Sequence, residues 1–238
     1  MKMTLLAIDT SGQTACAAIV DETQIVGEIA LNARTGEKSW THSEILMPGI
    51  DELFRLVGVD MHSIDYIAYT NGPGSFTGLR IGASTALGLG AGLNKPTIAV
   101  PTLDALAYNM KCCGHTVVPM MDARRGQVYS AIYSKETVRV SDYFALPVED
   151  VLAQIPSEAI FLGDGACTYK DIILAAKPDA IFAAPNNNRQ RASSAAVWAI
   201  EQIRAGFVPD SSVEILYVRE PQAVQDLKRK ANQEVGGV

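Results

Sequence analysis

Apolar and polar residues follow two different periods along the first 111 residues. Short runs in which apolar residues alternate with polar ones or stand together predict β-strands, and apolar residues that recur every three or four positions predict helices. The predicted strands cover residues 4–8, 14–20, 24–31, 65–71 and 97–100. The predicted helices cover residues 45–57, a stretch from about 78 to 93, and 102–110, with Ser43 and Thr102 as N-caps. The polar stretch 32–41 predicts a loop.

The same order of elements then begins again. A strand over 116–122 ends in Asp122, as the first strand ends in Asp9, and a turn and a second strand over 128–133 follow. Further on, the strand 159–162 runs into Gly163-Asp164-Gly165, as the strand 65–71 runs into Gly72-Pro73-Gly74. A weak repeat of this period indicates two similar α/β halves. The order predicts a duplicated actin/hexokinase/RNase H-like fold, with two lobes that each have a mixed sheet flanked by helices. Two unrelated α/β domains are the alternative.

This duplication sets the expected domain boundaries. We expect a first lobe over residues 1–111 that carries any dimer or partner interface, and a second lobe over 112–220. A C-terminal helix and tail are expected over 221–238.

Composition excludes several classes of protein. The 238 residues are 48% hydrophobic and 19% charged, which is typical of a globular protein that buries a sizeable core. The net charge of −6 argues against a stand-alone nucleic-acid binder, because such proteins normally carry a basic balance. No apolar run approaches the roughly 18 residues of a membrane span. Four cysteines are too few for a disulfide scaffold, and with no export signal they predict a cytoplasmic protein.

Metal-ligating residues are sparse. The three histidines are His42, His62 and His115, and no two of them lie within five residues, so no helical histidine pair is expected. Cys112 and Cys113 lie near His115, but their spacing matches no common zinc pattern. We therefore expect no metal site.

The glycine-rich segment 72–78 is the strongest candidate for binding chemistry. It follows a strand and opens a helix, where free backbone N–H groups favour an anion. It lacks the lysine of a P-loop and the third glycine of the dinucleotide fingerprint, so a tight strand-to-helix connection is the alternative. The candidate nucleotide or anion residues are Asp9, Thr10, Ser11, Gly72, Gly74, Ser75 and Arg124. Single acids at Asp9 and Asp122 offer little for Mg²⁺, so no cofactor is required and only weak ATP or ADP binding stays open.

The helix that follows this segment is unusually rich in glycine. Each interior glycine costs a helix about 0.8–1 kcal/mol relative to alanine, so some other interaction must offset that cost. Small residues four positions apart let another backbone approach, either from the helix's own sheet or from a second subunit. With the helix 45–57, this helix gives the candidate interface residues Ile45, Leu46, Ile50, Phe54, Leu79, Gly82, Ala83, Ala86 and Leu87.

Five segments of the chain carry further information: Leu5-Leu6-Ala7-Ile8-Asp9-Thr10-Ser11, the block from Asn71 to Gly82, Met121-Asp122-Ala123-Arg124, Gly163-Asp164-Gly165 and Tyr217-Val218-Arg219. Together they closely resemble the bacterial TsaB (YeaZ) family. The resemblance spans nearly the whole chain. It implies a two-lobed, actin-like relative of TsaD, the catalytic subunit that transfers a threonylcarbamoyl group to N6 of the adenosine beside the tRNA anticodon.

The resemblance also implies a non-catalytic role with defined partners. A TsaD-type subunit would bind the two helices of the first lobe, a TsaE-type ATPase would join the complex, and tRNA would be reached only through the complex. The chain would form a homodimer when TsaD is absent. TsaD holds its metal with a His-x-x-x-His pair, which His42 and Leu46 do not provide, so no catalytic residues and no peptidase activity are expected.

Two further expectations follow. Gly82→Arg or Leu79→Glu should weaken partner binding with little loss of fold. The alternative function is a weak nucleotide-dependent sugar- or acid-kinase-like enzyme of the same fold, which would use Asp9 and the segment 72–78.

Overall fold

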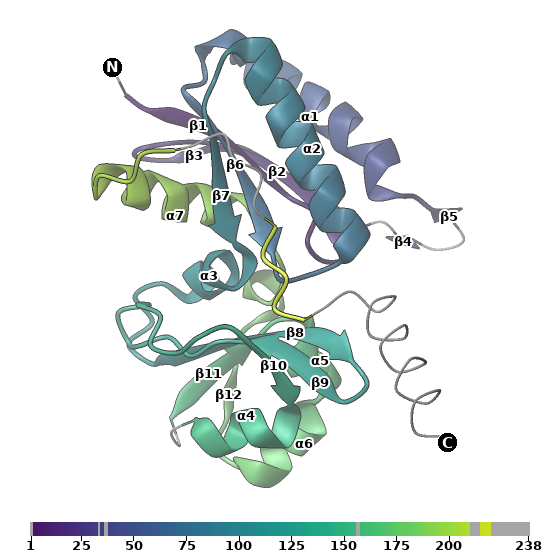
Figure 1. The fold of residues 1–238 in the computed structure, drawn as a ribbon, viewed down its shortest axis with the longest axis vertical. Coiled ribbons are helices and arrows are strands. Elements are labelled where there is room, and N and C mark those ends of the chain that lie inside the picture. The colour runs from purple at the N-terminus through teal and green to yellow at the C-terminus, as the bar shows by residue number, and fades with distance from the viewer. Residues whose placement is uncertain (1, 33, 36–37, 156–157, 210–214, 220–238) are drawn as a thin grey trace, which may run out of the picture.

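The first of two lobes is built on a five-stranded mixed sheet. The computed structural model describes residues 2–32, 34–35, 38–155, 158–209 and 215–219. The strands of the first sheet are β1 (Thr4–Asp9), β2 (Thr14–Asp21), β3 (Ile25–Asn32), β6 (Tyr66–Gly72) and β7 (Thr97–Pro101). Their order is β3-β2-β1-β6-β7, with β2 antiparallel to both of its neighbours, β1 and β3, and with β1, β6 and β7 parallel (Figure 1).

The second sheet repeats this arrangement. Its strands are β8 (Thr116–Arg124), β9 (Gln127–Ser130), β10 (Phe144–Pro147), β11 (Ala159–Leu162) and β12 (Ile181–Phe182). The order is β10-β9-β8-β11-β12, with antiparallel pairing on the β9 side of β8 and parallel pairing on the β11 side. Counted in chain order within its lobe, each sheet therefore reads 3-2-1-4-5. This identity of topology confirms the duplicated actin/hexokinase/RNase H-like fold, and two unrelated domains are excluded.

Three long helices cover the first sheet. The helices α1 (His42–Val57) and α2 (Phe76–Leu93) lie on one face, and α7 (Ala192–Arg204) lies on the other (Figure 1). Successive residues of β1 point to opposite faces, so Leu6 packs under α1 and α2 whereas Leu5 packs under α7. The helix α7 falls in the range 112–220 that we predicted for the second lobe, yet it packs on the first sheet and belongs to that lobe. The predicted helix and tail over 221–238 lie outside the described residues.

Shorter helices complete the second lobe and the junction. The helices α4 (Val148–Gln154), α5 (Asp164–Thr168) and α6 (Lys170–Ala176) pack around the second sheet. The helix α3 (Thr102–Ala107) lies between the lobes, where Ala105 joins the core of the first sheet and Leu103 joins that of the second. Single 3₁₀ turns cover Met61–Ser63, Tyr108–Met110 and Pro185–Asn187. In the described part of the chain, no helix has both the length and the apolar character that a membrane crossing requires.

Four local predictions differ from the structure. The N-cap of α1 is Thr41 rather than Ser43, because Glu44 accepts the Thr41 backbone N–H in a capping box (2.7 Å). The range 32–41 contains a short antiparallel pair, β4 (Arg34–Thr35) with β5 (Lys38–Ser39), rather than a loop alone. Thr102 is the first residue of α3 and not its cap. The strand β9 ends at Ser130, and Tyr133, at the predicted end of this strand, makes only isolated bridges to Val117 and Arg139.

Candidate functional site

The glycine-rich segment packs against the turn that follows β1. The backbone N–H of Ser75 donates to the carbonyl oxygen of Ser11 (2.7 Å), and a Cβ atom at Gly74 would lie 2.5 Å from the same oxygen. A Cβ atom at Gly78 would overlap the carbonyl oxygen of Thr10. The Ser75 hydroxyl caps α2 by accepting from the Gly78 N–H (3.2 Å). The close approach that glycine permits here is therefore made to the chain's own backbone.

Asp9 is the buried centre of that turn. Its Oδ1 accepts from the Ser11 backbone N–H (2.8 Å), the Ser11 hydroxyl (2.6 Å) and the Thr70 hydroxyl (3.0 Å). Burial raises the pKa of Asp9, although these hydrogen bonds act in the opposite direction. Oδ2 is also buried and has no hydrogen-bond partner among the described residues. The structure therefore gives Asp9 the role of an acceptor that shapes the Ser11 turn.

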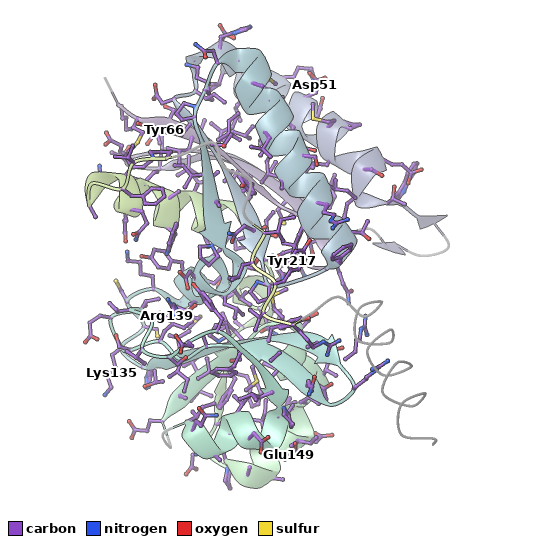
Figure 2. The ribbon with its side chains drawn as sticks, in the orientation of Figure 1. Asp51, Tyr66, Lys135, Arg139, Glu149 and Tyr217 are labelled. Atoms are coloured by element: carbon purple, nitrogen blue, oxygen red, sulfur yellow. The ribbon has the colours of Figure 1, made fainter. Side chains whose placement is uncertain are left out.

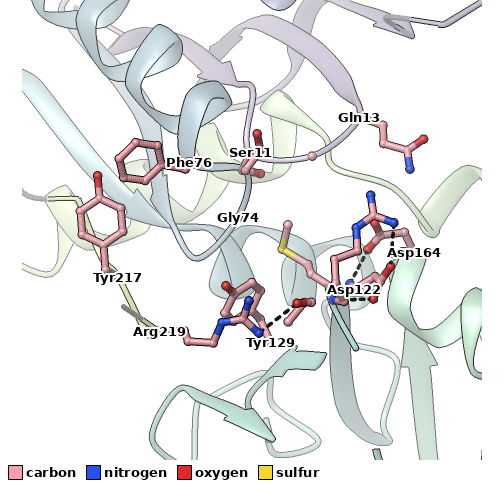
Figure 3. A pocket seen from close by; sticks show the side chains of 14 residues that line it. Ser11, Gln13, Gly74, Phe76, Asp122, Tyr129, Asp164, Tyr217 and Arg219 are labelled. Carbon is pink, nitrogen blue, oxygen red and sulfur yellow. Dashed lines mark hydrogen bonds and ion pairs between the residues drawn. The ribbon is translucent and has the colours of Figure 1, made fainter. Parts of the chain in front are cut away.

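A cleft of about 430 Å³ lies between the lobes (Figure 3). Its lining residues come from the Ser11 turn, the start of α2, the β8–β9 hairpin, α5 and the segment 215–219: Ser11, Gly12, Gln13, Gly74, Ser75, Phe76, Met121, Asp122, Ala123, Arg124, Tyr129, Asp164, Tyr217 and Arg219. The structure thus brings four of the seven predicted nucleotide or anion residues to the cleft, namely Ser11, Gly74, Ser75 and Arg124. Asp9, Thr10 and Gly72 are buried behind its wall.

Two carboxylates stand together on the wall formed by the second lobe (Figure 3). The Asp122 backbone N–H donates to Asp164 Oδ1 (3.1 Å), and burial raises the pKa of Asp164. Asp122 Oδ1 accepts from the Arg124 backbone N–H (2.8 Å) and from the Tyr169 hydroxyl (3.1 Å), while the Arg124 guanidinium lies 3.3 Å from Oδ2. The Gly-Asp-Gly motif marks the position of Asp164 in the sequence, but no sequence pattern identified Asp164 as a site residue. The described residues contain no group of three or more His, Cys, Asp or Glu side chains that could hold a metal ion.

Aromatic residues form the opposite edge of the cleft. The rings of Phe76 and Tyr217 lie 5.5 Å apart, and the Arg80 guanidinium lies 3.8 Å from the Phe76 ring centroid. Arg219 donates to the Ala123 carbonyl oxygen (3.1 Å). Only a family motif marks Tyr217 and Arg219 in the sequence, because no local pattern places Tyr217 beside Phe76 or Arg219 beside Ala123.

The predicted interface residues divide unequally between core and surface. Seven of them are buried against the first sheet or its turns: Leu46, Ile50, Phe54, Leu79, Gly82, Ala83 and Ala86. Ile45 and Leu87 are partly exposed. The strongest apolar stripe of each helix holds it to its own sheet, and of these seven residues only Leu46 also lines a groove between the outer faces of the two helices. Leu79 is 1% exposed and a Cβ atom at Gly82 would overlap the Thr10 hydroxyl, so, against the expectation from sequence, we predict that Leu79→Glu and Gly82→Arg destabilise the fold itself.

The outer faces of the same two helices form an exposed groove. It is lined by Ser43, Leu46, Met47, Phe76, Thr77, Arg80, Ile81, Ser84 and Thr85, and its volume is about 480 Å³. Met47 is 42% exposed and Phe76 is 40% exposed. Gly88 and Gly92 on α2 have no atom within 4 Å of an added Cβ, so the close packing that explains Gly78 does not explain them. We call this surface the α1–α2 face.

Comparison with known proteins decides the family. The family model described as TsaD: tRNA N6-adenosine threonylcarbamoyltransferase matches residues 36–194. The TsaB protein of Bacillus subtilis is 31% identical over 182 residues, which cover 72% of this chain and 75% of that protein. The TsaB protein of Escherichia coli is 33% identical over 179 residues, which cover 71% and 75%. The chain belongs to the TsaB family.

A solved structure supports the same relationship. A protein from Pseudomonas aeruginosa, described as an uncharacterized protein with similarity to peptidase YeaZ, superposes with a TM-score of 0.75 at 25% identity. The match covers 91% of this chain and 100% of that one. TsaB membership thus confirms the resemblance found in residues 5–11 and 71–82, and the structure shows that these two motifs pack on each other as the Ser11 turn and the start of α2.

Proposed function

We propose that this chain is a non-catalytic scaffold subunit in the synthesis of threonylcarbamoyladenosine in tRNA, where it binds and supports a TsaD-type transferase. Its involvement in that modification is supported by relatives from Bacillus subtilis and Escherichia coli that are named as tRNA threonylcarbamoyladenosine biosynthesis proteins. The observation that carries the scaffold role is the exposed α1–α2 face.

The α1–α2 face has the features of a docking surface for helices. Large apolar side chains at Met47 and Phe76 are exposed on two neighbouring helices and line one groove, and contiguous exposed apolar surface of this kind marks interaction sites. Gly88 and Gly92 leave α2 bare, so a partner helix could approach its backbone closely. We place the TsaD-type subunit on this face. A second copy of the chain would occupy it when the transferase is absent, as an isologous homodimer.

The polar groups of the cleft favour a scaffold over an enzyme. Backbone N–H groups of Ser75 and Gly78 at the start of α2 are already bonded within the chain. The Arg124 guanidinium is paired with Asp122, and Arg219 is held by a carbonyl oxygen. Groups that already form hydrogen bonds or ion pairs within the chain would have to break them to bind a phosphate. We therefore propose that no cofactor is required, that any ATP or ADP binding is weak, and that a TsaE-type ATPase and tRNA act through the assembled complex.

Reconstitution tests the proposal. A TsaD-type subunit, a TsaE-type ATPase, ATP, threonylcarbamoyl-adenylate and tRNA are mixed with and without this chain, and modified adenosine is measured. We expect modification only when the chain is present, and none from the chain alone. Equal modification without it would reject the scaffold role, and Mg²⁺-dependent ATP turnover by the chain alone would favour a kinase-like enzyme.

A matched pair of substitutions tests the face itself. Met47→Glu places a charge in the groove and should abolish transferase binding, measured by calorimetry. Ile172→Glu on α6 changes a side chain of similar exposure (39%) in the second lobe and should leave binding unchanged. Full binding by the Met47 variant would show that the transferase docks elsewhere.

A further inference from the structure

Residues 215–219 cross from one lobe to the other at the mouth of the cleft, and we call them the strap. The segment passes beside the start of α2 toward β8 (Figure 1), and Tyr217 lies at the junction of the lobes (Figure 2). At the first lobe the Leu216 N–H donates to the Asn71 carbonyl oxygen (2.8 Å). Gly72 has a φ of +124°, and a Cβ atom there would overlap the Leu216 carbonyl oxygen. The strap therefore seats on the end of β6, where a side chain at residue 72 would displace it.

The other end of the strap is anchored to the second lobe. A guanidinium nitrogen of Arg219 donates to the Ala123 carbonyl oxygen (3.1 Å) and to Gln127 Oε1 (3.0 Å). Ala123 belongs to β8 and Gln127 to β9. Five residues thus bridge both sheets, so that a movement separating these edges of the cleft has to break one of the two anchors.

The middle of the strap reaches the α1–α2 face. The Tyr217 ring packs 5.5 Å from the Phe76 ring, and Arg80 stacks on Phe76 while its Nε donates to the Tyr217 hydroxyl (3.4 Å). Phe76 and Arg80 both line the groove of the α1–α2 face. Phe76 and Tyr217 also line the cleft. Phe76 therefore belongs to both surfaces, and Tyr217 of the strap packs against its ring.

We infer that the strap couples the interlobe cleft to the α1–α2 face, with Tyr217 and Arg219 as positioning residues that hold Phe76 and Arg80 in the conformation that a partner binds. The inference rests on the proposed function for the identity of that partner. Its physical basis is that a rigid, pre-ordered contact residue costs less entropy on binding than a mobile one. Releasing the strap would leave Phe76 and Arg80 free to move, and the partner would then have to order them.

Removing the far anchor tests this coupling without touching the groove. Arg219→Ala deletes the contacts to Ala123 and Gln127. The matched control is Arg204→Ala, which deletes the ion pair between Arg204 on α7 and Glu22 (3.1 Å). Two quantities are measured on the full chain: amide hydrogen exchange at Leu216 and affinity for the transferase subunit. We expect Arg219→Ala to speed exchange and to weaken binding about two- to tenfold, as loss of one ordered aromatic contact would. Arg204→Ala should change neither.

A second pair of variants separates positioning from general structural damage. Tyr217→Ala should weaken binding like Arg219→Ala, and Tyr217→Phe should keep affinity within about twofold, because it retains the ring and loses only a long hydrogen bond. If Arg219→Ala and Tyr217→Ala both free Leu216 for exchange but bind the transferase as tightly as the natural chain, the coupling is overturned. The proposed function then still stands, provided that Met47→Glu abolishes binding. If Met47→Glu also binds normally, the docking face itself is wrong.

Discussion

Gly78 lies so close to the carbonyl oxygen of Thr10 that a Cβ atom at residue 78 would overlap it. Gly88, further along the same helix, has no atom within 4 Å of an added Cβ. The glycines of α2 therefore have two different roles. Those near its start let the helix reach the Ser11 turn, and those toward its end leave a bare surface.

This division predicts opposite effects for two identical substitutions. Gly78→Ala should destabilise the chain by about 1–3 kcal/mol, because overpacking forces the helix away from the turn. Gly88→Ala should stabilise it by about 0.8–1 kcal/mol, because alanine is the better helix former and meets no neighbour. Urea unfolding of both variants measures the two free energies. Effects of the same sign would mean that backbone contact at Thr10 does not explain Gly78.

The sheets were predictable because their central strands are buried on both faces. Apolar runs such as residues 4–8 mark such strands directly, and the repeated aspartates at Asp9 and Asp122 place the same turn in both halves. The duplicated topology follows from that order. The placement of α7 did not follow, because the chain returns to the first sheet after completing the second, and no local pattern records such a crossing.

The candidate site was only partly predictable. Periodicity in α1 and α2 identifies one apolar stripe per helix, and that stripe faces the sheet, so Leu79 was assigned to an interface when it belongs to the core. Met47 lies outside the stripe and lines the exposed groove of the α1–α2 face. The strap could not be predicted from the sequence, because its contacts with Asn71 and Ala123 join residues far apart in the chain.

Leu79→Glu should unfold the first lobe rather than weaken an interface. The side chain is 1% exposed, and a carboxylate there would be buried without a partner, at a cost of about 3 kcal/mol or more. Ser84→Glu introduces the same group at an exposed position of α2 and should change stability by no more than about 0.5 kcal/mol. Thermal unfolding followed by circular dichroism distinguishes the two. A stable Leu79 variant would contradict the packing of α2 on its sheet.

Asp9→Asn should change how stability depends on pH. Burial raises the folded-state pKa of Asp9 above its ordinary value of 3.8, so the stability that its protonated form contributes is complete below that value. This contribution is lost as pH rises through the folded-state pKa, whereas the neutral amide of the variant does not titrate and loses nothing. The unfolding free energy of the variant minus that of the natural chain should therefore increase with pH above about 4.

Asp21→Asn provides the control of opposite sign. Burial would raise the pKa of Asp21, but hydrogen bonds from Lys2, Thr23 and Gln24 outweigh it and lower the pKa. The stability that ionised Asp21 contributes is therefore lost as pH falls below about 4, and the difference between variant and natural chain should shrink there. Denaturant titrations across the acid range measure both slopes. If the unfolding free energy of Asp9→Asn minus that of the natural chain does not change with pH, burial does not raise the pKa of Asp9.

A buried carboxylate, Asp104, joins α3 to the second lobe. The hydroxyls of Tyr133 and Tyr143 both donate to Asp104 Oδ1, and Asp104 and Tyr133 are almost fully buried. Tyr133→Phe should destabilise the chain by about 1.5–3 kcal/mol at neutral pH, because a hydrogen bond to a charged acceptor is lost inside the protein. Burial already raises the pKa of Asp104, and losing one of its donors should raise it further. The loss should therefore be smaller at acid pH, where the carboxyl group is neutral.

Tyr129→Phe, at a partly exposed tyrosine on the cleft wall, is the control and should cost less than about 0.5 kcal/mol. Equal losses at both positions would show that the Asp104 contact does not hold the lobes together.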